Sequence, residues 1–289
     1  MADARMIRKC WQLLVVGGVL TCLPRAADRV LGQETPAPKP PRIALVNPLS
    51  LLPGQKSRVT LRGWLLKDPV AVLADSEEIR ISVISHAAAA VPGRQKADQI
   101  GDEQLELDIE VPPGFSAEAT RLRVRTAAGE SQVYRLPIDR ALPVASEQEP
   151  NDGFRQPQQI TVPQLVVGSI HADSNVDVFA FDLSQPDKLR LHVEAAALGS
   201  ALDSVLTLWT AAGTFIASND DRLAGESSEQ MSDLPASVVR RDSQLSVELP
   251  AGRYLLTLQD AFDRGGPAHP YRLYVQQSPD TSMIQDAKQ

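Results

Sequence analysis

Cysteine is almost absent from this sequence of 289 residues. The only two, Cys10 and Cys22, lie within the first 32 residues. If that segment is removed on export, the remaining chain has no thiol and no disulfide, even in an oxidising compartment. This excludes a zinc site with cysteine ligands. Stability beyond that of the hydrophobic cores would then have to come from bound ions.

Catalytic signatures are missing too. The four histidines form neither an HExxH motif nor a pair at helical i, i+4 spacing. There is also no G-x-S-x-G elbow and no phosphate-binding P-loop. We therefore predict that the chain is not an enzyme. The histidines are His86, His171, His192 and His269.

Aromatic side chains and positive charge are scarce. Aromatic residues make up 4% of the sequence, so the cores must rest on Val, Leu, Ile and Ala. The 29 basic residues are outnumbered by 36 acidic ones, which gives a net charge of −7. A nucleic-acid binder needs a basic face to displace counterions, so we expect no nucleic-acid partner. An acidic surface suits divalent cations better.

The first 32 residues have the pattern of a secretory signal peptide. Basic residues at positions 5–9 precede an apolar stretch at 11–23, which is shorter than the roughly 20 residues that a membrane span requires. We predict cleavage between Ala27 and Gly32. Removal of 1–32, with five basic and two acidic residues, leaves 24 basic and 34 acidic groups and a net charge of −10.

This leader predicts that the protein is secreted, periplasmic or part of the cell envelope, with no membrane span after leader cleavage. Two alternatives are an uncleaved membrane anchor and lipidation at Cys22. A lipoprotein signal carries Gly, Ala or Ser before its cysteine, whereas this chain has Thr21.

Composition divides the remaining chain into two globular segments, 42–138 and 147–276. The proline-rich stretch 33–41 is typical of a stiff linker. Residues 139–146 join the two segments, and the polar, aperiodic stretch 277–289 is typical of a flexible tail.

Both segments alternate apolar and polar residues with a period of two, as half-buried strands do. We predict an all-β chain with two antiparallel β-sandwich domains, the first Ig-like and the second resembling a jelly roll. His192 falls on the charged side of its strand and is expected to be exposed. Trp209 and Tyr274 either pack in the protein or stack on a sugar or peptide. The predicted strands are 59–66, 79–83, 105–111, 122–124, 133–136, 166–170, 178–183, 188–194, 205–209, 215–218, 244–249, 254–258 and 271–275.

The start of the first segment resembles an IPT/TIG-like domain of immunoglobulin type. The resemblance rests on P-R-I-A-L-V-N-P, L-P-G and V-T-L-R-G-W-L-L, between residues 41 and 66. It implies an Ig-like sandwich that acts as a spacer or interaction module.

An acidic hinge opens the second segment. Glu147, Glu149, Asn151 and Asp152 place four oxygen-bearing side chains within six residues. Ca²⁺ takes six to eight such oxygens at about 2.3–2.6 Å, so one short segment does not complete a site. The best complement is 169–177, which holds Asp173, Asn175 and Asp177 just before a predicted strand.

The second segment, 146–276, resembles a bacterial pre-peptidase C-terminal (PPC) domain. The motifs are E-Q-E-P-N-D-G-F at 147–154, V-V-G-S-I at 166–170 and N-V-D-V-F-A-F-D-L at 175–183. Two longer motifs at 202–221 and 242–258 follow in the same order. The family is a β-sandwich found beside secreted peptidases and on other exported proteins. It includes collagen-binding modules that bind Ca²⁺ through the segment entering the domain.

The resemblance implies a structural Ca²⁺ and its ligands. The family has an Asp-x-Asp pair before the aromatic strand, and this chain has Asn175-Val176-Asp177, so one ion fits better than two. The implied ligands are Glu147, Glu149, Asn151 and Asp152, with Ser169 and Asp177 as partners and Asp173 and Asn175 near enough to contribute.

A second group of polar residues lies near the ends of other predicted strands. These residues form either a second metal site or turns whose side chains bond to nearby backbone. They are Asp203, Asn219, Asp220, Asp221 and Asp242.

We predict a non-catalytic exported accessory protein, in which a Ca²⁺-stabilised PPC-type module for binding or targeting follows an Ig-like spacer. Its partner would be an extracellular or envelope protein or a polysaccharide. The alternatives are a subunit or remnant of a secreted peptidase and a structural component of the cell envelope.

Overall fold

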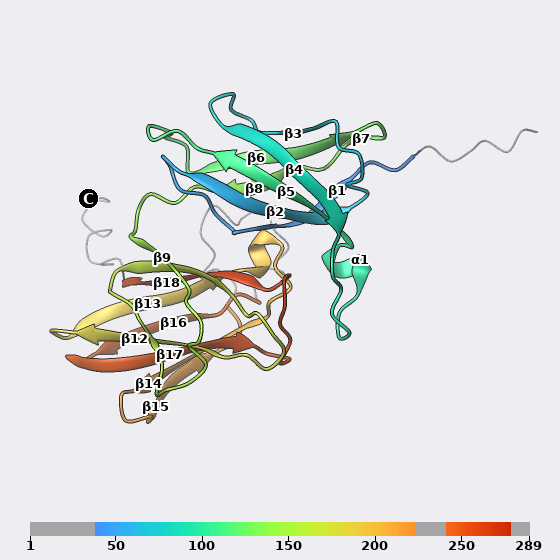
Figure 1. Cartoon of the computed structure of the whole chain (residues 1–289). Coiled ribbons are helices and arrows are strands. Elements are labelled where there is room, and N and C mark those ends of the chain that lie inside the picture. Colours follow the sequence, from blue (N-terminus) through green and yellow to red (C-terminus); the bar gives the residue numbers. More distant parts are fainter. Residues whose placement is uncertain (1–37, 223–240, 279–289) are drawn as a thin grey trace, which may run out of the picture. The chain divides into compact units, whose positions relative to one another are not determined.

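The computed structural model describes residues 38–222 and 241–278. The predicted leader, most of the first linker and nearly all of the predicted tail therefore lie outside the described residues. No helix within the described ranges is long and apolar enough to cross a membrane. The described chain is all-β and forms sandwich-like pairs of sheets, as the sequence predicts (Figure 1).

The N-terminal half contains two four-stranded sheets. The first has the order β1-β2-β5-β4, and the second has the order β3-β6-β7 with β8 paired to β6. A single short helix, α1 (Ala97–Ile100), precedes β5. The strands are β1 (Arg42–Asn47), β2 (Lys56–Trp64), β3 (Ala71–Leu73), β4 (Arg80–Ala88), β5 (Glu103–Glu110), β6 (Ala119–Thr126), β7 (Gly129–Glu130) and β8 (Tyr134–Pro137).

Every strand predicted in this half is present, and β1, β3 and β7 were not predicted. β3 and β7 are too short to display a period of two. In β1 the pairing register shifts between Ile43 and Leu45, so its apolar residues do not alternate regularly. The alternating residues of β2, β5 and β6 supply the core, in which Leu61, Leu107 and Leu122 are fully buried.

The C-terminal half contains two five-stranded sheets. Their orders are β10-β12-β17-β14-β15 and β16-β13-β18-β11-β9. All eight strands predicted here are present, together with two short ones, β9 and β10. The strands are β9 (Val144–Ser146), β10 (Gln158–Gln159), β11 (Gln164–Ser169), β12 (Asp177–Leu183), β13 (Asp187–Glu194), β14 (Ser204–Thr210), β15 (Phe215–Asn219), β16 (Gln244–Leu249), β17 (Gly252–Asp260) and β18 (Pro270–Gln277).

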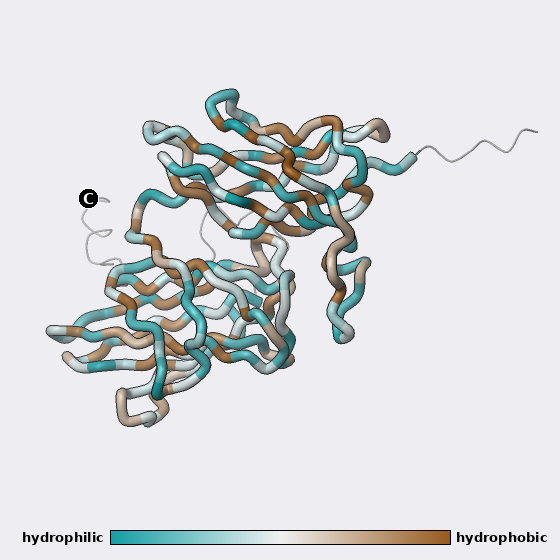
Figure 2. Tube along the Cα trace, in the orientation of Figure 1, coloured by the Kyte–Doolittle hydropathy of each residue, from teal (hydrophilic) through white to brown (hydrophobic). Residues whose placement is uncertain are grey.

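The core of this half follows the predicted alternation. Phe179 and Phe181 on β12 point inward with Leu256 and Leu258 on β17, and all four are fully buried. Figure 2 shows the same alternation along the strands, with brown apolar residues between teal hydrophilic ones. Because successive side chains of a strand point to opposite faces, this pattern determines which face meets the core.

His192 is buried, contrary to the prediction that it is exposed. It is 7% exposed and stacks on Tyr274, with ring centroids 4.4 Å apart and planes 2° apart. The two residues are opposite each other in the pairing of β13 with β18. Burial lowers the pKa of His192 well below its usual value, and the nearby positive charges of arginine side chains lower it further. The alternation of apolar and polar residues showed that His192 is on the face of β13 that points away from the core. It could not show that Tyr274 packs against His192 on that face.

The described strand pairs of the N-terminal sheets are antiparallel, as predicted, whereas the C-terminal half has two parallel pairs, so its two sheets are mixed. β9 runs parallel to β11, and β10 runs parallel to β12. Residues 144–146, which the sequence assigned to a linker, form β9 and belong to a sheet. β9 and β10 lie in different sheets, so the hinge between them crosses from one sheet to the other. This crossing positions the candidate site.

Candidate metal centre

The acidic hinge is held at one end of the C-terminal sandwich by backbone pairing. Because β9 is parallel to β11, the chain leaves β9 where β11 ends, at Ser169. Because β10 is parallel to β12, the chain approaches β10 from the end where β12 begins, at Asp177. The N–H of Glu147 donates to the carbonyl of Val167 at 2.9 Å, and the N–H of Val178 donates to the carbonyl of Asn151 at 2.9 Å.

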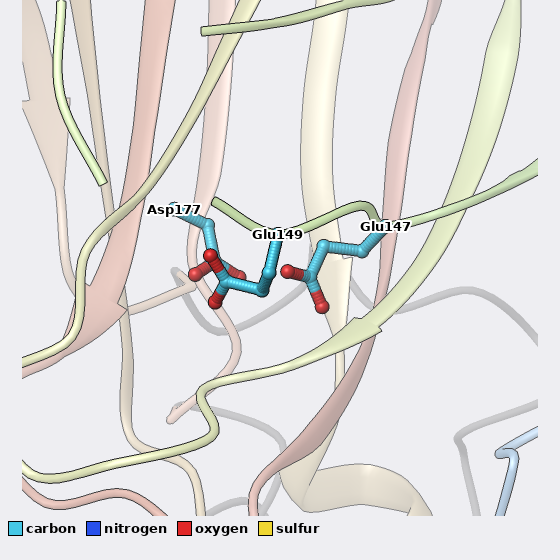
Figure 3. A group of neighbouring side chains, drawn as sticks. All are labelled: Glu147, Glu149 and Asp177. Atoms are coloured by element: carbon cyan, nitrogen blue, oxygen red, sulfur yellow. The ribbon is translucent and has the colours of Figure 1, made fainter. Parts of the chain in front are cut away.

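Three carboxylates meet at this crossing. One oxygen each from Glu147, Glu149 and Asp177 lies within 4.8 Å of the other two, and Figure 3 shows these groups facing one another. Among the residues that the structure describes, this is the one group of three or more His, Cys, Asp or Glu side chains at such distances. The sequence had assigned all three residues to the same metal site.

Asp177 is the most deeply buried of the three, with no exposed surface. Its Oδ2 accepts a hydrogen bond of 2.5 Å from the Tyr271 hydroxyl, whereas its Oδ1 has no hydrogen-bond partner among the described residues. The pKa of Asp177 is raised to about 8, chiefly by burial and also by the negative charges of Glu147 and Glu149, and the hydrogen bond from the Tyr271 hydroxyl acts in the opposite direction.

Glu147 is half-buried and partly satisfied by the backbone. Its Oε2 accepts the Ser169 N–H at 3.3 Å, and its Oε1 lies 3.5 Å from the Asn151 side-chain nitrogen. Burial raises the pKa of Glu147, and the charge of Glu149 acts in the same direction. Both effects show that the site disfavours negative charge when no cation is present.

Asn151 contributes a second buried oxygen without a partner. The residue is 0% exposed, and its backbone N–H donates to Glu149 Oε2 at 3.0 Å. Its Oδ1 has no hydrogen-bond partner in the described part of the chain. A buried polar atom without a partner costs about 1–3 kcal/mol. A cation bound between Asn151 Oδ1 and Asp177 Oδ1 would satisfy both atoms, so the donor set fits a hard divalent ion.

The remaining predicted ligands surround this centre. Asn175 uses both ends of its side chain, since it donates to Asp152 Oδ1 at 2.7 Å and accepts the His171 N–H at 3.3 Å. Asp173 Oδ1 accepts the Gly265 N–H at 3.0 Å. Asp152, Asp173 and Asn175 therefore hold loops next to the carboxylates. Ser169 donates its backbone N–H to Glu147.

His171 also touches the site, although the sequence gave no reason to expect it as a Ca²⁺ ligand. Its Nδ1 lies 2.5 Å from Glu149 Oε1. A hollow of about 260 Å³, lined in part by Asp152, His171 and Asn175, lies beside the carboxylates.

Two residues that sequence reasoning missed shape the centre. A Cβ on Gly168 would lie 2.5 Å from the Tyr271 hydroxyl oxygen and 2.6 Å from the Cβ of Glu147, so only glycine fits between them. A glycine within a predicted strand signals such a close approach. Tyr271 faces Gly168 across the pairing of β11 with β18, and no local pattern marks it as part of the site.

The second predicted group does not converge in the same way. Asp242 is fully buried and accepts the N–H groups of Ala195, Ala196 and Ala197 at 2.8–3.2 Å, which fixes the 3₁₀ turn at Ala196–Leu198. Burial raises its pKa to about 7 despite these donors. Asn219 Oδ1 accepts the Gln244 N–H. Asp203, Asp220 and Asp221 complete the predicted group. Among the described residues, they form no second cluster of three carboxylates with Asp242.

The two aromatic residues differ in their surroundings. Tyr274 packs between His192 and Arg272, whose guanidinium carbon lies 5.2 Å from the tyrosine ring centroid. Trp209 is partly buried and meets Phe154 and Phe215 edge-on, with centroids 5.4 and 5.9 Å away. Tyr274 is therefore a packing residue, whereas Trp209 belongs to a partly exposed aromatic cluster.

Comparison with known proteins gives distant structural similarity only. No family model and no curated protein matches the chain. The pre-peptidase C-terminal domain of a collagenase from Bacillus anthracis has a TM-score of 0.30 and 14% identity, over 47% of this chain and 98% of that one. The SGBP-B protein of the Bacteroides ovatus mixed-linkage glucan utilization locus, in complex with a mixed-linkage heptasaccharide, has a TM-score of 0.22 and 10% identity, over 73% and 71%. The secreted serine protease VesC from Vibrio cholerae has a TM-score of 0.24 and 10% identity, over 80% and 49%. Scores this low assign no function.

Proposed function

We propose that this protein is a non-catalytic exported accessory protein whose C-terminal sandwich is a PPC-type module that binds Ca²⁺ at the acidic hinge. One observation carries the proposal. Glu147, Glu149 and Asp177 bring three carboxylate oxygens within 4.8 Å of one another, and the buried Asp177 Oδ1 and Asn151 Oδ1 have no hydrogen-bond partner among the described residues. Like charges that close repel one another, so such a group either holds a proton or binds a cation.

Ca²⁺ is the ion that fits this donor set best. All the converging ligands are oxygens, and Ca²⁺ accepts six to eight of them in flexible geometry. The three carboxylates and Asn151 Oδ1 supply four or more, and water would complete the shell. Zn²⁺ is less suitable because it prefers nitrogen and sulfur ligands in tetrahedral sites, and His171 is the sole such group beside the described carboxylates.

The bound ion would join two segments that are separate in sequence, the hinge and the start of β12, and the end of β11 would be tied to them through the hydrogen bond from the Ser169 N–H to Glu147. Binding would then stabilise the crossing of the chain from one sheet to the other. The chain between the halves continues directly into this crossing through β9. In this role the N-terminal Ig-like sandwich is a spacer, and the C-terminal sandwich attaches to an extracellular or envelope protein or to a polysaccharide.

Calorimetric titration of the metal-free protein with Ca²⁺ tests the proposal. We expect one ion per chain for the wild type and binding at least about tenfold weaker for Asp177→Asn, because an amide cannot supply the carboxylate charge. Asp182→Asn is the matched control, since Asp182 is on the same strand but exposed and paired with Arg253. Titration without heat or with unchanged affinity for Asp177→Asn would refute the site.

A further inference from the structure

Strand β4 ends the sheet β1-β2-β5-β4 and is paired along one side only. It is nine residues long, which makes it the longest of the strands that lie at the edges of the four described sheets. β7 and β10 have two residues each, and β3 and β9 have three. A long edge strand presents a row of backbone N–H and C=O groups to which another strand can pair.

The side chains of β4 are uncovered as well. All of its residues except the partly buried Ile81 are exposed, and Val83 and Ile84 are 40% and 48% exposed. Val83 lies opposite Leu107 in the pairing of β4 with β5, and Leu107 is fully buried. The apolar row of the core therefore continues from β5 onto β4, where Val83 stays 40% exposed although β3 of the opposite sheet contacts this strand.

β4 lacks most of the features that normally protect an edge strand. Its sequence, R-I-S-V-I-S-H-A-A, contains no lysine, no acidic residue and no proline. Its only fixed charge is Arg80, at the first position. A single bulge at Ile84 interrupts the register with β5 and leaves four paired residues on either side. Natural sheets usually block pairing with charges, proline or very short edges.

We propose that β4 is a dimerisation edge, where the β4 strand of a second copy of this chain pairs antiparallel to it. A two-fold axis near Ile84 would place Arg80 of each copy beside the alanine end of the other strand. The two arginines would then be roughly 27 Å apart at about 3.4 Å per residue, so they do not oppose each other. The antiparallel arrangement therefore places no like charges opposite each other.

Two identical antiparallel strands form a closed pair, because each β4 strand has one open side and the pairing occupies both of them. No β4 side then remains free for a third copy. The pairing joins two four-stranded sheets into one of eight strands and covers Val83 and Ile84 of both copies. β4 carries no acidic residue, so the net negative charge of each chain opposes association only at long range. Salt screens such repulsion, with a Debye length of about 8 Å at physiological ionic strength.

Sedimentation velocity of the full chain from about 1 to about 100 µM tests this edge, since a dimer is favoured by mass action. We expect a concentration-dependent dimer that does not weaken as the salt concentration rises. The double variant Val83→Lys/Ile84→Lys should weaken dimerisation at least about tenfold by placing like charges across the new pair. Val133→Lys is the matched control, because Val133 is 43% exposed and lies outside β4.

Disulfide trapping locates the contact independently. In a Cys10→Ser/Cys22→Ser background the chain has no cysteine, so Ile84→Cys introduces a single thiol close to the proposed axis. Opposed Cα atoms in an antiparallel pair are about 4.5–5.5 Å apart, which a disulfide can span. We expect a covalent dimer for Ile84→Cys and none for Val133→Cys. A monomer at every concentration, or a dimer that Val83→Lys/Ile84→Lys leaves intact, would overturn the proposal.

Discussion

Proton release on Ca²⁺ binding is the sharpest consequence of the site. Burial raises the pKa of Asp177 to about 8 in the metal-free protein, and no described residue forms a hydrogen bond with its Oδ1. At neutral pH the carboxyl group is therefore mostly protonated. A calcium ligand must be the carboxylate, so the ion has to displace this proton when it binds.

The size of the effect follows from the pKa. At pH 7 a group with a pKa of about 8 is about nine-tenths protonated, so each ion bound should release about 0.9 proton. Below pH 8 the apparent Ca²⁺ affinity should fall about tenfold per pH unit, or about 1.4 kcal/mol, and above pH 8 it should level off. The raised pKa of Glu147 would steepen the dependence at lower pH.

The same shift sets the sign of the stability change. Between the ordinary pKa near 3.8 and the folded value of about 8, the native state binds more protons than the unfolded chain. The metal-free protein should therefore lose stability as pH rises through this window, and saturating Ca²⁺ should abolish the trend, because Asp177 is then ionised in both the native and the unfolded state. Below about pH 3.8 the stabilising contribution of protonated Asp177 to the folded state is fully present.

Calorimetric titration at pH 6, 7, 8 and 9, in buffers with different ionisation enthalpies, measures both affinity and proton release. Asp177→Asn should abolish the proton release together with most of the affinity, and Asp182→Asn should change neither. Strong Ca²⁺ binding with no proton release at pH 7 would refute the argument, because Asp177 would then be ionised before the ion arrives.

Three other predictions follow from named contacts. Glu149→Gln should weaken Ca²⁺ binding at least about tenfold, with no change in the melting temperature measured in EDTA, because Glu149 is exposed. Gly168→Ala should destabilise the protein by about 1–3 kcal/mol in chemical denaturation, because the new methyl group would clash with Tyr271 and Glu147. Gly153→Ala is the control and should be nearly neutral, because a Cβ there meets nothing within 4 Å. The folded pKa of His192 is lowered, so the protein should lose stability as pH falls below about 6.5, by up to about 1.4 kcal/mol per pH unit. Chemical denaturation at pH 5 and pH 7 should show this loss of stability in the wild type and not in His192→Gln.

The architecture could be predicted where the strands are long and have one face on the core. β12, β13 and β17 alternate clearly because successive side chains point to opposite faces. The two short parallel strands β9 and β10 could not be predicted in this way. Two or three residues show no period, and their pairing depends on partners farther along the chain.

The candidate site divides along the same line. The sequence by itself determined the chemistry, since the hinge carboxylates and Asp177 are oxygen ligands that can be read directly from their residue types. The tertiary structure alone decided which of them converge, which oxygens lack partners, and that Gly168 and Tyr271 enclose them. The physical reason is that burial and repulsion between like charges depend on distances in space, and segments 20 to 120 residues apart create those distances only after the sheets have paired.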